Sequence, residues 1–153
     1  MISTNARLAN LEQTIAELEA MDDWHSIVLA RADIGIFDWP LQTNKMYLSP
    51  SFKKILGYDE HEFLTELDTW WPLFHADDCD QVASEIEAAI CSGSDKYRAL
   101  HRMKHRNGTV IWFLFRASIL RSKNRMPTRM IGAAIDVSDV KIHLFKPFET
   151  VAD

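Results

Sequence analysis

Three consecutive strand-like segments in the second half of the chain constrain its fold most. In the first, which begins at Tyr97, basic residues alternate with Ala99, His101 and Met103, a period of two that is typical of a strand with one wet face. The pair Asn107-Gly108 follows and predicts a type I′ hairpin turn, because both residue types tolerate a positive φ. The second segment covers residues 109–120 and the third covers 130–137. The pattern predicts three antiparallel strands.

The middle segment, 109–120, is rich in β-branched and aromatic residues and barely alternates. An antiparallel sheet normally keeps one face in contact with water, so a strand that is apolar on both sides is unusual. We therefore expect a separate cover for each face of this strand.

Size and composition indicate one ordinary globular domain. The chain has 153 residues, of which 47% are hydrophobic and 25% charged. No apolar run approaches the roughly 20 residues that span a bilayer, and the N-terminus lacks the pattern of a secretory signal. Cys79 and Cys91 are roughly 18 Å apart if they share one helix, too far for a disulfide. We expect a cytoplasmic protein that does not bind a membrane.

The charge is unevenly distributed. Residues 96–129 hold ten Lys or Arg and no acid, whereas residues 1–95 hold eighteen acids and five bases. A basic sheet can bind nucleic acid, but an acidic first half would repel phosphates. We favour the interpretation that the bases form the solvated face and edge of the strands, without a nucleic-acid partner.

The N-terminal segment predicts a helix over residues 4–20. Its apolar residues follow the 3-4-3 spacing of a coiled-coil seam, namely Leu8, Leu11, Ile15 and Leu18. The seam covers two heptads and then meets Asp22-Asp23, and a helix this short needs a partner in water. Two alternatives stay open: the stripe packs on its own domain, or it forms a dimer.

The remaining segments complete an α+β pattern. We expect a helix at 24–32, strands at 34–39 and 45–48, and a helix at 51–56 opened by Ser49-Pro50. A further helical turn should begin at Asp59, an aromatic irregular segment covers 69–75, and a helix capped by Asp77 covers 79–91. The fold class is thus α+β, with a five-stranded antiparallel sheet, short helices on one face, and the N-terminal helix as candidate cover for the other.

Four segments of the sequence resemble a known family. The segments IGIFDWPLQTNKMYLSPSFKKILGYDEHEF, WWPLFHADDCDQV, YRALHRMKHRNGTVIWFLFRASIL and RMIGAAIDVSD resemble, in order and spacing, a PAS domain with a trailing PAC motif. Ala76 replaces the proline that usually follows the histidine in the second segment. The resemblance covers about Ile34 to Asp139. It implies three parts, namely an N-terminal helical region at 1–32, a PAS domain at 33–140, and a C-terminal linker or tail at 141–153.

The resemblance also implies a site. PAS domains of bacterial signalling proteins bind a small ligand or cofactor between sheet and helices, or serve as dimerisation modules. The implied ligand pocket consists of Trp39, Tyr47, Phe52, Ile55, Leu56, Phe63, Trp71, Phe74, His101, Met103, Phe113, Phe115, Met130 and Ala134. These side chains either line a ligand pocket or fill it as a packed core. His101 either contacts a ligand and senses pH, or is a buried neutral imidazole, which we favour.

On the opposite face the family register places Trp112 and Leu114. We expect the seam of residues 8–18 to cover them, from the same chain or from a dimer partner. Asp136 and Ser138 belong to the family's closing motif, which implies a signal relay from the last strand.

Haem and flavin are both disfavoured, and the cofactor stays unknown. The long helix has no histidine that could ligate iron, and the segment after the short helices lacks the cysteine of light-oxygen-voltage domains. Ala134 cannot hydrogen-bond a flavin. Met103 and Phe113 stand where light-oxygen-voltage domains have asparagines that bind the flavin ring. The run His75-Ala76-Asp77-Asp78 is better explained by helix capping than by a metal site.

The sequence therefore predicts a sensory or dimerisation module and not an enzyme. It would bind a small ligand or form a homodimer, and relay a change to a linked or separate effector. The alternative is a ligand-free scaffold for protein–protein interaction. A small-molecule enzyme is a third class, for which the sequence shows no catalytic signature.

Overall fold

The structure is a computed structural model that describes residues 4–62 and 65–139. Its contacts divide the chain into two units, residues 1–32 and residues 33–153. Phe63 and the expected C-terminal linker at 141–153 lie outside the described residues. Each unit is described by itself.

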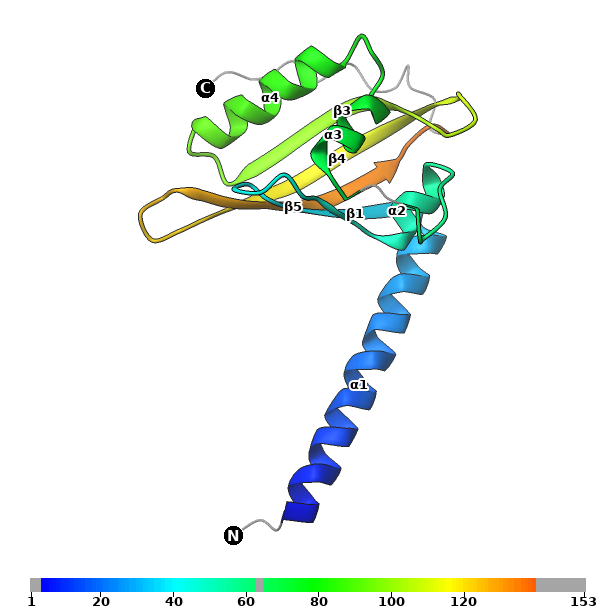
Figure 1. Cartoon of the computed structure of the whole chain (residues 1–153), viewed down its shortest axis with the longest axis vertical. Helices are drawn as coiled ribbons and strands as arrows, with labels where there is room; N and C mark the ends of the chain where they lie inside the picture. Colours follow the sequence, from blue (N-terminus) through cyan, green and yellow to red (C-terminus); the bar gives the residue numbers. More distant parts are fainter. Residues whose placement is uncertain (1–3, 63–64, 140–153) are drawn as a thin grey trace. The chain divides into compact units, whose positions relative to one another are not determined.

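The first unit is a single helix, α1 (Thr4–Arg31) (Figure 1). The expected break at Asp22-Asp23 is wrong. Aspartate is a modest helix former, and no Gly or Pro interrupts residues 4–31, so continuing the backbone hydrogen bonds costs less than creating two new helix ends. The four seam residues, Leu8 to Leu18, are all more than half exposed in the single chain.

The second unit contains a five-stranded antiparallel sheet, as the sequence predicted. Its strands are β1 (Ile34–Pro40), β2 (Tyr47–Leu48), β3 (Lys96–Lys104), β4 (Val110–Arg121) and β5 (Pro127–Asp136), in the order β2-β1-β5-β4-β3. β4 is paired along its length with β3 and β5. β2 is shorter than expected because Lys45 bridges Glu66 instead of continuing along β1.

Helices α2 (Pro50–Ile55), α3 (Leu67–Trp70) and α4 (Cys79–Cys91), with the 3-10 turn η1 (Trp71–Leu73), lie on one face of this sheet (Figure 1). The Ser49 hydroxyl accepts the Phe52 N–H, and Pro50 takes the first helical position, as expected. Two other expectations are wrong: residues 59–62 form turns without a helix, and residues 69–73 are helical where an irregular segment was expected.

The turn between β3 and β4 is not type I′. That turn needs a positive φ at both central residues, and of the pair only Gly108 has one, at 90°. The N–H of Gly108 donates to the carbonyl of His105, and the N–H of His105 donates to the carbonyl of Thr109. The result is a longer loop in which Asn107 uses its side chain to accept the Thr109 N–H.

The register of β4 explains why both of its faces are apolar. Ile111, Phe113 and Phe115 are buried toward the helices, whereas Trp112 and Leu114 on the other face are half-buried. Leu114 lies opposite Leu100 of β3 and Ile135 of β5, so the second face also carries an apolar centre. What covers this second face stays a prediction.

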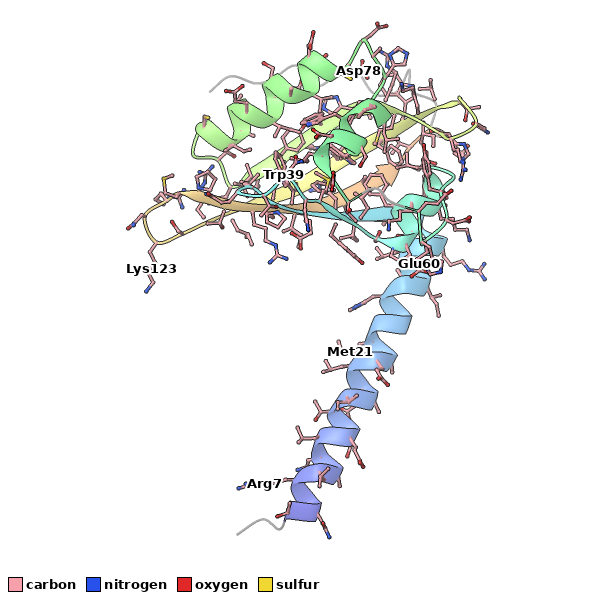
Figure 2. The ribbon with its side chains drawn as sticks, in the orientation of Figure 1. Arg7, Met21, Trp39, Glu60, Asp78 and Lys123 are labelled. Carbon is pink, nitrogen blue, oxygen red and sulfur yellow. The ribbon has the colours of Figure 1, made fainter. Side chains whose placement is uncertain are left out.

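The ten Lys and Arg of residues 96–129 form a basic block. They make more ion pairs with acidic residues earlier in the chain than the sequence indicated. At least five of its ten bases form ion pairs, among them Arg102–Asp78, Arg106–Glu62, Arg121–Asp95, Arg125–Asp95 and Arg129–Asp38. Arg106, Arg125 and Arg129 stay about half exposed or more, so the expected solvated face is corrected only for Arg102 and Arg121. Lys123, by contrast, lies at the tip of the β4–β5 hairpin and points away from the core (Figure 2).

Gly35 generates a prediction about the contact between β1 and α2. A Cβ at Gly35 would lie 2.3 Å from Cγ of Phe52, whose side chain is fully buried. We expect Gly35→Ala to lower the free energy of unfolding by about 1–3 kcal/mol, because the buried ring cannot move aside without strain. Urea denaturation measures this change.

The double variant Gly35→Ala/Phe52→Leu is the control, since a smaller side chain at position 52 relieves the overlap. Its loss of stability should be smaller than the sum of the two single losses. Strictly additive losses would show that the overlap with Phe52 is not the cause.

Candidate ligand cavity and signal path

A small cavity lies between the sheet and the helices of the second unit. Its volume is about 10 Å³, and its walls come from strands β1, β3, β4 and β5 and from helices α3 and α4. The lining residues are Phe37, Trp39, Met46, Trp70, Phe74, Val82, Ile86, Tyr97, His101, Phe115 and Met130. This volume is close to the minimum for one water molecule and far below the roughly 300 Å³ of a small ligand pocket.

The predicted pocket residues divide into four groups. Trp39, Phe74, His101, Phe115 and Met130 line the cavity. Phe52, Leu56, Met103, Phe113 and Ala134 are buried in the surrounding core, while Ile55 and Trp71 are partly buried against it. Tyr47 is 56% exposed and does not belong to the pocket. The prediction for Tyr47 is wrong because it pairs with Asp38 and alternates with buried Met46 and Leu48, so its side chain faces away from the core.

Sequence reasoning missed several lining residues. Tyr97 could have been found, because strict alternation with Ala99 and His101 turns it toward the helices. Val82 and Ile86 belong to the apolar stripe of α4, which predicts burial but not which strand residues they meet. Met46 comes directly before a strand of only two residues and carries no such pattern.

The polar centre of the cavity wall is His101, which is 3% exposed. Its Nε2 lies 3.0 Å from the hydroxyl of Tyr97 and 3.1 Å from Oε2 of Glu85 on α4. The carboxylate of Glu85 can only accept a hydrogen bond, whereas the hydroxyl of Tyr97 can donate to Nε2 or accept from it according to the tautomer of the ring. The contact joins the middle of α4 to the inward face of β3.

Burial determines the protonation of this cluster. It lowers the pKa of His101, and the charge of Glu85 opposes the shift without cancelling it. Burial also raises the pKa of Tyr97, and the negative charge of Glu85 adds to that rise. Burial thus favours the neutral imidazole of His101 over the charged form.

A second polar contact joins the start of α4 to the edge of the sheet. Asp78 precedes α4 (Figure 2), and its Oδ2 accepts hydrogen bonds from the backbone N–H and Nε of Arg102, at 3.0 and 3.1 Å. Its Oδ1 accepts from Nη2 of Arg102 at 2.6 Å. These bonds lower the pKa of Asp78.

The expected capping of α4 by Asp77 is wrong, because the residue at the N-cap is Asp78. Capping by the side chain of Asp78 is wrong as well. It occupies the N-cap position, but its side chain makes no capping hydrogen bond. β3 is an edge strand, and its outward N–H groups need partners; the carboxylate of Asp78 satisfies the one on Arg102.

The path continues from Arg102 to the end of β5. The guanidinium of Arg102 lies 5.4 Å from the ring centre of Trp112, a cation–π distance. The N–H of Trp112 donates to Oγ of Ser138 at 3.0 Å, and its carbonyl accepts the N–H of Val137 at 2.9 Å. The N–H of Ser138 donates to Oδ1 of Asp136. The start of α4 is thus linked through two side chains to the segment 136–138.

The cavity and the described side chains limit which cofactor or metal the domain can hold in this arrangement. A flavin-sized group does not fit a cavity of about 10 Å³ in this arrangement. Among the residues that the structure describes, His, Cys, Asp and Glu form no group of three that could hold a metal ion. Over the same residues, no helix combines the length and the apolar character needed to cross a bilayer.

Comparison with known proteins assigns the fold. A family model described as PAS fold matches residues 45–134, more than half of the chain. The chain belongs to this family.

One curated relative is the probable diguanylate cyclase DgcE of Escherichia coli K12, 29% identical over 103 residues. The match covers 66% of this chain but only 8% of the relative, so the chain corresponds to a small part of that protein.

Solved structures agree. A sensory box histidine kinase/response regulator from Burkholderia thailandensis superposes with a TM-score of 0.65 and 34% identity, over 78% of this chain and 88% of that one. The N-terminal domain of a diguanylate cyclase with PAS/PAC sensor from Marinobacter aquaeolei gives a TM-score of 0.62 at 21% identity, over 69% and 95% of the two chains. The chain is a sensory module of the kind used in signal transduction.

The lowered pKa of His101 generates a pH prediction. Unfolding restores its ordinary value of 6.5, so below that pH the unfolded chain binds a proton that the folded chain does not. The free energy of unfolding should therefore fall as the pH drops below about 6.5, by up to about 1.4 kcal/mol per pH unit. Chemical denaturation across pH 5–8 measures this slope.

His101→Gln should flatten that slope, because glutamine can still donate to Glu85 but does not titrate. His61→Gln is the matched control at an exposed position, and its stability should follow the parent protein across the range. An unchanged slope in His101→Gln would assign the pH dependence to other groups.

Proposed function

We propose that this PAS domain is a non-catalytic sensor whose receiving element is helix α4 and whose output is the segment 136–138. The observation that carries the proposal is the chain of contacts from Asp78 through Arg102 and Trp112 to Ser138. A stimulus that moves the start of α4 must stretch or break this chain, since each contact is a short-range polar or cation–π interaction.

The stimulus is a small ligand or a partner that acts on the helical layer. His101 and Tyr97 supply the polar groups at the cavity, and Glu85 extends that polar cluster from α4. A ligand larger than a water molecule has to displace lining side chains, and displacing Val82 or Ile86 moves α4. Ligand entry and movement of α4 are therefore coupled in this proposal.

The output serves an effector that is linked to the domain or bound by it. One relative is a probable diguanylate cyclase and one structural neighbour is a histidine kinase/response regulator. We propose an effector of one of these classes, with the domain acting as a homodimer in the cytoplasm. The family match at residues 45–134 describes the PAS fold and no effector domain, so the effector class rests on the relatives.

A second candidate is a ligand-free interaction scaffold, and the small cavity favours it. About 10 Å³ leaves no room for a resident metabolite without rearrangement. In that case α4 responds to a protein partner, and the aromatic side chains around His101 serve as packing.

Native mass spectrometry and absorbance of the purified chain separate the two candidates. The scaffold predicts the mass of the polypeptide, 17.6 kDa, or its multiples, with no bound organic molecule. A retained small molecule that is lost in a Val82→Trp variant, which fills the cavity, would overturn the scaffold and support the ligand sensor.

The path itself predicts a local effect of Asp78→Asn. Loss of the charged acceptor should accelerate hydrogen exchange at the Trp112 and Val137 N–H groups by about fivefold, equivalent to ~1 kcal/mol of local protection. Hydrogen exchange measured by NMR gives both amides separately.

Asp77→Asn is the matched control, because Asp77 is its exposed neighbour and acts on Arg102 through its charge alone, without a hydrogen bond among the described contacts. The N–H of Ile119, which donates to the carbonyl of Asp95 near the other end of β4, should keep its rate in both variants. Unchanged rates at Trp112 and Val137, or equal acceleration at Ile119, would refute the path.

A further inference from the structure

The charges beside the seam of α1 specify how two copies of this helix can pair. If Leu8 and Ile15 take heptad position a, then Leu11 and Leu18 take position d. The positions that flank an a/d seam are e and g. In this register Arg7 takes g, and both Glu12 and Glu19 take e.

In a parallel two-stranded coiled coil, each g residue lies beside the e residue five positions further along the partner helix. Arg7 and Glu12 are five positions apart and have opposite charges. A parallel dimer in register therefore gains two such ion pairs, one on each side of the seam.

The antiparallel arrangement is disfavoured by the same residues. It brings e positions beside e positions, and both e residues of the seam, Glu12 and Glu19, are acidic. Isoleucine at a with leucine at d, as in Ile15 and Leu18, is also the combination that favours two parallel strands.

The apolar seam has a defined end. The next a position is Asp22 and the next d position is His25, so the third heptad replaces two apolar layers with polar ones. Polar residues at a and d weaken a coiled coil and fix its register. The helix itself continues to Arg31, although the apolar seam ends at Leu18.

We propose that α1 pairs with α1 of a second copy of this chain as a parallel, in-register coiled coil over residues 7–18, with Arg7 of each chain beside Glu12 of the other. This inference deepens the proposed function, on which it rests for the idea of a homodimer, by stating the partner and geometry of α1. Two apolar heptads make a weak contact, so the dimer fraction should rise with protein concentration.

Arg7 and Glu12 allow a clean test, because both are exposed (Figure 2 labels Arg7) and neither has a charged residue three or four positions away in its own helix. Reversing the charge of either residue therefore changes contacts between two helices more than contacts within a single helix. The experiment uses the full chain, with dimer dissociation constants from analytical ultracentrifugation at low salt.

Arg7→Glu and Glu12→Arg should each raise the dissociation constant about tenfold, since each turns two attractions into two repulsions. An equal mixture of the two variants should associate at least as tightly as the parent chain, because both flanking contacts of the mixed pair are attractive. The double variant Arg7→Glu/Glu12→Arg should recover the parent value. High salt should shrink all these differences.

Glu17→Arg is the matched control. It makes the same change of charge on the same helix, but at position c, away from the seam. It should leave the dissociation constant within about twofold of the parent chain.

Each other result is decisive. A mixture that associates no better than the separate variants overturns the parallel register. A dimer unaffected by both Arg7→Glu and Glu12→Arg means that another surface holds the copies together, and a monomer at every concentration overturns the interaction itself. The exchange rates of Trp112 and Val137 in Asp78→Asn are independent of these results, so the signal path and the dimer helix can fail separately.

Discussion

The attachment of helix α4 to the sheet is the constraint on which the rest of the domain depends. Three polar contacts hold the helix at its start, middle and end. Asp78 binds Arg102 before the first turn, Glu85 binds His101 at the centre, and Arg121 of β4 donates from Nη2 to the carbonyls of Ile90 and Ser94 at the end. Between them, Val82 and Ile86 are buried against the core.

These contacts restrict α4 more narrowly than apolar packing alone. Hydrogen bonds weaken steeply when their distance or angle changes, whereas apolar side chains tolerate small sliding motions. Arg121 shows the limit of the arrangement: its Nε lies 3.3 Å from Asp95 yet makes no hydrogen bond, because the charges are close but poorly aligned. The helix is thus held by hydrogen bonds at its start and end, and by the close contact of Glu85 with His101 at its middle.

Local chemistry made much of this fold predictable from the sequence. Alternation placed His101 and Met103 on the inward face, the family resemblance placed Phe113 there, and the Ser49-Pro50 pair opened α2 where it was expected. The failure at Asp78 comes from competition between local and long-range partners. Asp78 has the local pattern of a helix cap, but a guanidinium and an edge N–H of β3 bind it more strongly.

The candidate site was less predictable for the same reason. Glu85 is one of several acids on the exposed side of a helical pattern, and nothing in its own neighbourhood indicates that it meets His101. That contact depends on how far α4 is rotated and shifted along β3, which the periodicity of neither element determines. Tyr47 failed in the opposite way, since a strand of two residues is too short for alternation to fix its face from the sequence.

The proposed weakness of the α1 coiled coil is consistent with a signalling role. A dimer held by two apolar heptads and two exposed ion pairs is in balance with its monomer. A change of about one or two kcal/mol in the free energy of association then changes the dimer population several-fold. The contacts of α4 have energies of that order, since hydrogen bonds to charged groups contribute about 1.5–3 kcal/mol each. A tight, permanent coiled coil would require a much larger input at α4 before the dimer responded. In the proposed dimer, the short seam, ended by Asp22 and His25, limits the free energy of association to the size of one or two such polar contacts.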